Sequence, residues 1–185
     1  KGREAYSCDI LPCSGGHPEW HIQDDVSKIL EQDWDLIIAH PPCTYLTITG
    51  NRWFNIERYG DKAIQRHKDR EEAVKFFMQF VNCSCEKVCI ENPVGYIGTS
   101  YRKADQIIHP YMFGHPVRKK TCLWLKGLPL LKPTKVVEPD IVKLGDGKTY
   151  SKWYLESSWY TPEERARHRS KTFEGIAEAM AEQWG

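Results

Sequence analysis

Short apolar runs bounded by turns alternate along the chain with one long amphipathic segment. Three of the runs, Tyr6–Leu11, Asp35–Ala39 and Lys87–Glu91, stop at turns that contain proline. Continuous apolar runs with such boundaries are typical of strands buried in a parallel sheet. A fourth run, Thr121–Leu125, predicts a further short strand. The pattern therefore predicts an α/β fold.

Residues 61–82 predict an amphipathic helix between the second and third strands. Apolar side chains recur there at steps of three and four behind a charged face, at Ile64, His67, Ala73, Val74, Phe76, Phe77, Phe80 and Val81. A strand, a helix and a second strand in this order form a βαβ unit, whose crossover we expect to be right-handed. Two later helices are also expected. Thr161-Pro-Glu-Glu has the pattern of a capping box, and Thr172 can begin a helix that ends near Trp184.

Length and composition suit a single domain over residues 1–185. A chain of this size buries about 70% of the surface that its unfolded form exposes. Lys and Arg number 26 against 25 Asp and Glu, so overall charge predicts no polyanionic partner and any nucleic-acid contact must be local. The chain has no apolar stretch near the ~18 residues of a membrane span, and it does not open on a charged and then apolar leader. We therefore expect a cytoplasmic protein without a membrane segment.

Chemically versatile residues follow three of the predicted strands. Asp9 ends the first run, Cys43 follows Pro41-Pro42 after the second, and Glu91-Asn92 ends the third. In open α/β sheets, ligands bind beyond the carboxyl ends of the strands. These residues therefore predict a site, although each of them alone is also an ordinary turn residue.

Two other kinds of site fit the sequence less well. The seven cysteines lie in apolar runs, as reduced core residues do. Neither Cys83, Cys85 and Cys89 nor Cys13, His17 and His21 have the paired spacing of a zinc site, so no metal is expected. Pairing Cys43 with His115 as in a thiol protease lacks a recognisable oxyanion site.

Three motifs, in the order expected, resemble those of cytosine-C5 DNA methyltransferases. "PPCTYLTITGNR" is similar to the Pro-Pro-Cys motif, and "IENPVG" resembles the Glu-Asn-Val motif with Pro93 in place of valine. "FGHPVRKKTCLWL" resembles the Gly-x-Pro-Gln-x-Arg-x-Arg strand, although Val117, Lys119 and Thr121 replace Gln, Arg and Arg. The similarity is greatest to small phage and prophage methyltransferase-like proteins, over residues 40–133 and the ending "GIAEAMAEQWG". HPPC also resembles the motif of amino-group methyltransferases, but a cysteine together with a Glu-Asn motif favours C5 chemistry.

The resemblance implies a Rossmann-like, S-adenosylmethionine-dependent methyltransferase fold that acts on cytosine in DNA, in the cytoplasm of a bacterium or a phage-infected host. In this family a cysteine thiolate adds to C6 of the base, which makes C5 nucleophilic. Cys43 is carried over as this nucleophile, and Glu91 as the carboxyl group that protonates N3. Asn92 is expected to orient the loop or contact the base edge. Lys119 is expected to hold a carboxylate or a phosphate, without the bidentate geometry of arginine.

The resemblance also implies a cofactor site. Asp9 is expected on the ribose hydroxyls of S-adenosylmethionine and Asp25 on its adenine amino group, with Leu11 and Ile22 beside the adenine. Asp9 could equally cap a turn. The residues expected to bind the cofactor are Asp9, Ile10, Asp25, Val26, His40 and Pro41.

Two features of the family are not found where the resemblance expects them. Its first strand and Gly-containing loop should precede Lys1, and the opening "KGRE" is typical of a helix end, so we expect an upstream segment that carries them. Residues 126–170 form a short irregular insert in place of a large target-recognition region. "GDGKTYSKWYLESSWY" and "RARHRSK" in that insert could stack bases and contact phosphates, or form a packing cluster under a solvated helix face.

Two alternatives for the function follow from these departures. The same chemistry could act on a free or modified pyrimidine nucleotide, because a short insert limits the readout of a DNA sequence. Alternatively, the chain could be a non-catalytic nucleic-acid-binding relative that retains the fold.

Overall fold

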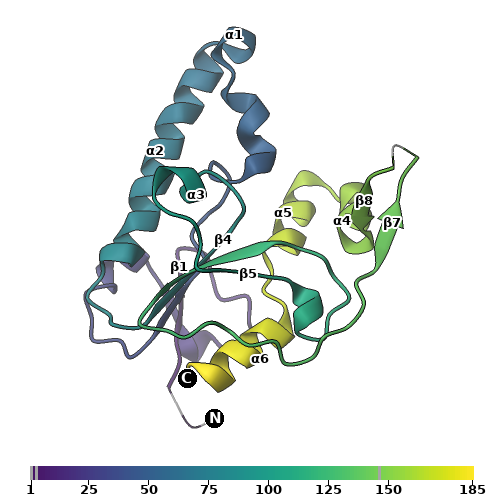
Figure 1. The fold of residues 1–185 in the computed structure, drawn as a ribbon. Helices are drawn as coiled ribbons and strands as arrows, with labels where there is room; N and C mark the ends of the chain where they lie inside the picture. Colours follow the sequence, from purple (N-terminus) through teal and green to yellow (C-terminus); the bar gives the residue numbers. More distant parts are fainter. Residues whose placement is uncertain (1, 3, 146) are drawn as a thin grey trace.

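A computed structural model describes residues 2, 4–145 and 147–185 (Figure 1). The fold is mixed α/β, with one four-stranded sheet, two smaller sheets and several helices. The larger sheet has the strand order β3-β4-β6-β5, from β3 (Ile37–Ala39), β4 (Val88–Pro93), β5 (Gln106–Ile108) and β6 (Thr121–Lys126). β3 runs parallel to β4, whereas β6 is antiparallel to both of its neighbours. Strands expected at residues 35–39, 87–91 and 121–125 are confirmed, and β5 was not predicted.

Helices cover both faces of this sheet. α2 (Asp61–Asn82) packs on one face and α6 (Glu174–Gln183) on the other (Figure 1). Along β4 the side chains alternate between the faces, so Val88 and Ile90 meet α2 while Cys89 meets α6. The two apolar cores include Phe77, Phe80 and Trp124 on the α2 side, and Leu123, Ile176 and Met180 on the α6 side. Among the described residues, no helix has the length and apolar character that a membrane crossing requires.

α2 occupies the 22 residues predicted for it. Gly60 separates it from α1 (Ile56–Tyr59) with a φ of 51°, a backbone conformation that side-chain-bearing residues rarely adopt. α1 and the first half of α2 project from the body of the molecule (Figure 1). The segment that links β3 to this projection includes the 3₁₀ helix η3 (Ile48–Phe54).

The first predicted strand lies outside the larger sheet. β1 (Ser7–Asp9) pairs in parallel with β2 (His21–Gln23) in a sheet of two strands. The expectation of a buried strand is wrong here, because most of β1 is exposed and Ile10 beyond it is 70% exposed. The opening "KGRE" includes residues 1 and 3, which lie outside the described residues.

The expected irregular insert contains regular structure from residue 141 onward. β7 (Ile141–Lys143) and β8 (Thr149–Ser151) pair as an antiparallel hairpin, followed by α4 (Lys152–Glu156) and α5 (Pro162–Ser170). The capping box of α5 is confirmed, since Thr161 Oγ1 accepts from Glu164 N at 3.2 Å and Glu164 Oε2 accepts from Thr161 N at 2.9 Å. The last helix begins two residues later than predicted, because Phe173 precedes α6 and packs against neighbouring rings. The remaining short helices are η1 (Pro18–Trp20), η2 (Val26–Lys28), α3 (Ile97–Ser100), η4 (Pro110–Met112) and η5 (Ser157–Trp159).

Candidate active site

The segment after β3 meets the last residues of β4 at one edge of the larger sheet. β3 ends at Ala39, which pairs with Ile90, whereas β4 continues to Pro93 and pairs there with β6. Asn92 Nδ2 donates to the carbonyl oxygen of Pro41 at 2.8 Å. His40 Nδ1 lies 3.3 Å from Glu91 Oε2. The edge is therefore built from two segments that lie 51 residues apart in the sequence.

The half-buried thiol of Cys43 lies within the electrostatic reach of two other predicted catalytic residues. Burial raises the pKa of Cys43 above its ordinary value, and the negative charge of Glu91 raises this pKa further. The ammonium group of Lys119 acts in the opposite direction and lowers the pKa. Because burial and Glu91 prevail, the thiol is mostly protonated at neutral pH.

A tight turn follows Cys43 and packs against the loop after β4. The amide groups of Leu46 and Thr47 both donate to the Cys43 carbonyl oxygen, each at 3.0 Å. Gly95 pairs with Thr47 in an isolated β-bridge, and Tyr96 N donates to the Leu46 carbonyl oxygen at 2.7 Å. A Cβ atom on Gly95 would lie 1.9 Å from the Leu46 oxygen, so only glycine allows this approach. Our reading of the sequence missed Gly95, although its place in the "IENPVG" motif was a signal.

Asn92 is the most deeply buried of the predicted site residues, with 1% of its surface exposed. Its amide nitrogen holds Pro41, which agrees with the expected role in orienting the loop. Its Oδ1 atom has no hydrogen-bond partner among the described residues. A buried polar oxygen of this kind is normally satisfied by water or a ligand.

Lys119 joins the larger sheet to the C-terminal segment. Its Nζ atom donates to the Arg169 carbonyl oxygen at 2.9 Å and lies 5.9 Å from the ring centres of Trp153 and Phe173. The ammonium group is therefore already held by the protein, and it still influences Cys43 through its charge.

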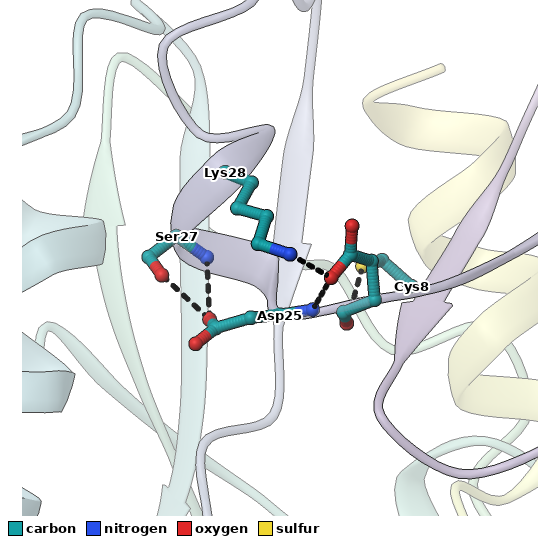
Figure 2. Close-up of polar contacts among 5 residues, drawn as sticks. Cys8, Asp25, Ser27 and Lys28 are labelled. Atoms are coloured by element: carbon teal, nitrogen blue, oxygen red, sulfur yellow. Dashed lines mark hydrogen bonds and ion pairs between the residues drawn. The ribbon is translucent and has the colours of Figure 1, made fainter.

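The two acidic residues expected at the cofactor make local contacts near the smaller parallel sheet. Asp9 Oδ1 accepts from Leu11 N at 2.9 Å. Asp25 Oδ1 accepts from the backbone nitrogen and the hydroxyl of Ser27, at 2.9 and 2.6 Å, and so caps η2 (Figure 2). These bonds lower the pKa of Asp25. Both residues therefore act as caps, which is the role that the sequence left open for Asp9.

The other residues expected at the cofactor have diverse surroundings. Ile10 is exposed, whereas Val26 packs against the apolar core on the α2 side. His40 and Pro41 contact Glu91 and Asn92, as described above, and so belong to the edge that carries Cys43. Beside Asp25, the ammonium group of Lys28 pairs with Asp24 at 2.6 Å (Figure 2).

Most aromatic side chains of the C-terminal segment pack against one another. Trp153 stacks on His168 with ring centres 4.8 Å apart, and Tyr160 meets the same histidine edge-on at 5.1 Å. The guanidinium group of Arg169 lies 4.0 Å from the ring centre of Tyr154. This arrangement is the packing cluster that the sequence offered as an alternative to a nucleic-acid contact.

Trp159 differs from these residues because its side chain faces solvent, with 89% of the residue exposed. The turn that carries it is nevertheless well held. Arg165 donates to the carbonyl oxygens of Ser157, Ser158 and Tyr160 at 3.0 to 3.1 Å. Trp159 is thus an exposed indole on a fixed turn.

Cysteine and histidine clusters do not form a metal centre in the part of the chain that the structure describes. No group of three or more His, Cys, Asp or Glu side chains is arranged to hold a metal ion there. All seven cysteines are free thiols. The candidate chemistry therefore centres on Cys43 and its neighbours.

Comparison with known proteins finds no family model and no curated protein that matches this chain.

Proposed function

We propose that the chain is a Rossmann-like, S-adenosylmethionine-dependent methyltransferase that modifies C5 of cytosine in DNA through a covalent adduct with Cys43. One observation carries the proposal: Cys43, four residues beyond the end of β3, lies close enough to Glu91 on the neighbouring parallel strand β4 for the carboxylate to raise the pKa of the thiol. The motif resemblance requires these two groups to act on the same base.

The proposed reaction uses Cys43 and Glu91 in sequence. Cys43 gives its proton to the Glu91 carboxylate as its sulfur bonds to C6 of the cytosine, and the electrons displaced from the C5–C6 double bond make C5 nucleophilic. Glu91 gives a proton to N3 and so neutralises the charge that would otherwise build up on the ring. His40, which is exposed and lies beside Glu91, can resupply that proton from solvent. After C5 has gained a methyl group, its proton passes to solvent, the sulfur is expelled as the double bond is restored, and the N3 proton returns to Glu91.

The cofactor role is carried by Asp9, Asp25 and Ile10. S-adenosylmethionine supplies the methyl group when it is bound. Carboxylates suit the ribose hydroxyls and the adenine amino group, and the local contacts of each aspartate use its Oδ1 atom. Ile10 offers an exposed apolar surface for an adenine ring. These residues fit the adenosine part of the cofactor.

DNA as the partner is supported by exposed aromatic residues that lie near cations. Trp53 is 42% exposed, and the guanidinium of Arg52 lies 4.6 Å from its ring centre. Both residues belong to η3, nine and ten residues after Cys43 in the sequence. Trp159 offers a second exposed ring in the C-terminal segment. Aromatic rings beside arginines can stack bases while the cations meet phosphates.

A free pyrimidine nucleotide remains the second candidate substrate. The observation in its favour is that the rings of Trp153, Tyr154 and Tyr160 already contact His168 or Arg169, so they are engaged within the C-terminal segment. A small substrate needs no such readout.

Tritium release separates these possibilities. The chain is incubated with S-adenosylmethionine and either duplex DNA or dCMP, each tritiated at C5 of cytosine. We expect release from DNA and its loss in Cys43→Ser, with retention in Cys13→Ser, which changes another half-buried free thiol. Release from dCMP alone would reject DNA as the substrate. Release that persists in Cys43→Ser would reject the covalent route.

A further inference from the structure

Two arginines of α2 reach the backbone directly after Cys43. Arg66 Nη2 donates to the carbonyl oxygen of Thr44 at 3.2 Å, and Arg70 Nε donates to that of Tyr45 at 2.9 Å. Both arginines lie on the same helix, one turn apart, and the two carbonyls are consecutive. The turn is therefore fastened to a 22-residue helix by its first two residues after the cysteine.

Arg70 is enclosed by groups from three segments. Only 9% of it is exposed, and its Nη2 atom donates to Asn51 Oδ1 at 2.8 Å. Its guanidinium contacts two rings, 3.3 Å from the centre of Phe54 and 4.5 Å from that of Tyr96. Burial lowers its pKa, yet a guanidinium remains charged in proteins. A buried cation held by a carbonyl, an amide and two rings fixes geometry at a cost in desolvation.

Arg66, which is less buried than Arg70, holds the same turn. Its guanidinium lies 4.9 Å from the ring centre of Tyr45 and 5.1 Å from that of Phe54. Gly50 makes room for it, because a Cβ atom there would lie 3.2 Å from Arg66 Nη2. The two arginines thus act on adjacent residues of one turn through separate hydrogen bonds.

We propose that Arg70 and Arg66 are positioning residues that fix the turn after Cys43, and with it the place of the thiol beside Glu91. Released from these hydrogen bonds, the turn would let Cys43 move toward solvent. Its pKa would then fall toward the ordinary value, because both burial and Glu91 raise it in the intact protein. The role of this positioning in catalysis rests on the proposed function. The hydrogen bonds that fix the turn do not depend on that function.

Alkylation of Cys43 tests the inference without cofactor or DNA. The rate of reaction with iodoacetamide is measured against pH, with the Cys43 peptide resolved by mass spectrometry from the peptides of the other six cysteines. For Arg70→Met we expect a lower apparent pKa and a rate at pH 7.5 that is roughly 5-fold higher. Arg70→Lys keeps one donor group, so its rate of Cys43 alkylation at pH 7.5 should lie between those of Arg70→Met and the parent protein.

Arg102→Met is the matched control. Arg102 also donates to backbone carbonyls, including that of Leu125, and its guanidinium lies 5.4 Å from the ring centre of Tyr101 and pairs with Asp105 at 2.8 Å. These contacts involve Lys103, Leu125, Tyr101 and Asp105, and none of them reaches the turn after Cys43. Arg102→Met should leave the pH dependence of Cys43 alkylation unchanged.

Either of two results would overturn the inference. One is a folded Arg70→Met protein whose Cys43 profile stays within about 2-fold of the parent. The other is an equal change in Arg102→Met. If Arg70→Met does not fold, Arg66→Met carries the same comparison, and an unchanged profile there overturns the inference as well.

The outcome is separable from that of the proposed function. A chain that shows the expected alkylation changes but methylates neither DNA nor dCMP would reject the proposed function alone. A chain that methylates DNA while Arg70→Met keeps the parent profile would reject the positioning role alone.

Discussion

The edge that carries Cys43 and the small parallel sheet that carries Asp9 are both strand ends with polar residues, yet they are built differently. At the first, Asn92 of β4 holds the backbone before Cys43, and Arg66 and Arg70 of α2 hold the backbone after it. At the second, Asp9 and Asp25 accept hydrogen bonds from residues two positions further along the chain. Long-range contacts fix the place of a side chain relative to the whole fold, whereas local caps fix only a turn. The first region therefore holds its side chains in place relative to the whole fold, as the proposed covalent chemistry would need.

Gly95→Val gives the largest expected effect on this difference. Any Cβ atom at Gly95 overlaps the Leu46 carbonyl oxygen, so the turn after Cys43 must move or the fold must yield. We expect a loss of ~3 kcal/mol in the free energy of unfolding, measured by urea denaturation.

Gly98→Ala is its control. A Cβ atom at Gly98 meets nothing within 4 Å, and alanine there should be neutral or slightly stabilising. Equal stability of the two variants would show that the approach of Gly95 to the turn is unimportant.

Much of the region around Cys43 could be predicted from the sequence, because short apolar runs predict strands and the prolines after them predict where the strands end. That reasoning brought Cys43, Glu91 and Asn92 to one edge. The roles of Arg66 and Arg70 could not be predicted, because the sequence pattern places both arginines on the charged face of an amphipathic helix. Only the structure shows that their side chains turn back onto the backbone after Cys43.

The N-terminal and C-terminal regions were less predictable for other reasons. The apolar run at residues 6–11 indicated a buried strand, but β1 pairs only with β2 and leaves Ile10 exposed. The start of α6 was displaced because tertiary packing of Phe173 prevailed over the N-cap signal of Thr172. In both places the deciding contacts come from residues far along the chain or from pairing that a pattern does not encode.

Charge variants of the first region should shift the pKa of Cys43 in opposite directions. Glu91→Gln removes a negative charge that raises the pKa, so the pKa should fall and alkylation at pH 8 should accelerate by ~3-fold. Lys119→Met removes a positive charge that lowers it, so the pKa should rise and alkylation should slow by a similar factor. The pH profile of alkylation measures both, and shifts in the same direction would refute the electrostatic arrangement.

The smallest effect is expected in the second region, from Asp25. Asp25→Ala removes the cap of η2 and should slightly lower the urea concentration at the midpoint of unfolding, whereas Asp25→Asn keeps a capping oxygen and should leave that midpoint nearly unchanged. If Asp25 also binds the cofactor, both variants should weaken the affinity for S-adenosylmethionine in calorimetry. If only Asp25→Ala, the less stable variant, binds S-adenosylmethionine more weakly, then Asp25 is a cap and does not bind the cofactor.

The central claim, a bond between Cys43 and a cytosine of DNA, is tested most directly with a duplex that contains 5-fluorocytosine. Fluorine at C5 cannot leave as the proton does, so the adduct should persist after methyl transfer. With S-adenosylmethionine present, we predict a stable protein–DNA complex whose peptide mass places the bond at Cys43. A complex linked through another residue, or no complex with DNA that the chain demonstrably methylates, would contradict the claim.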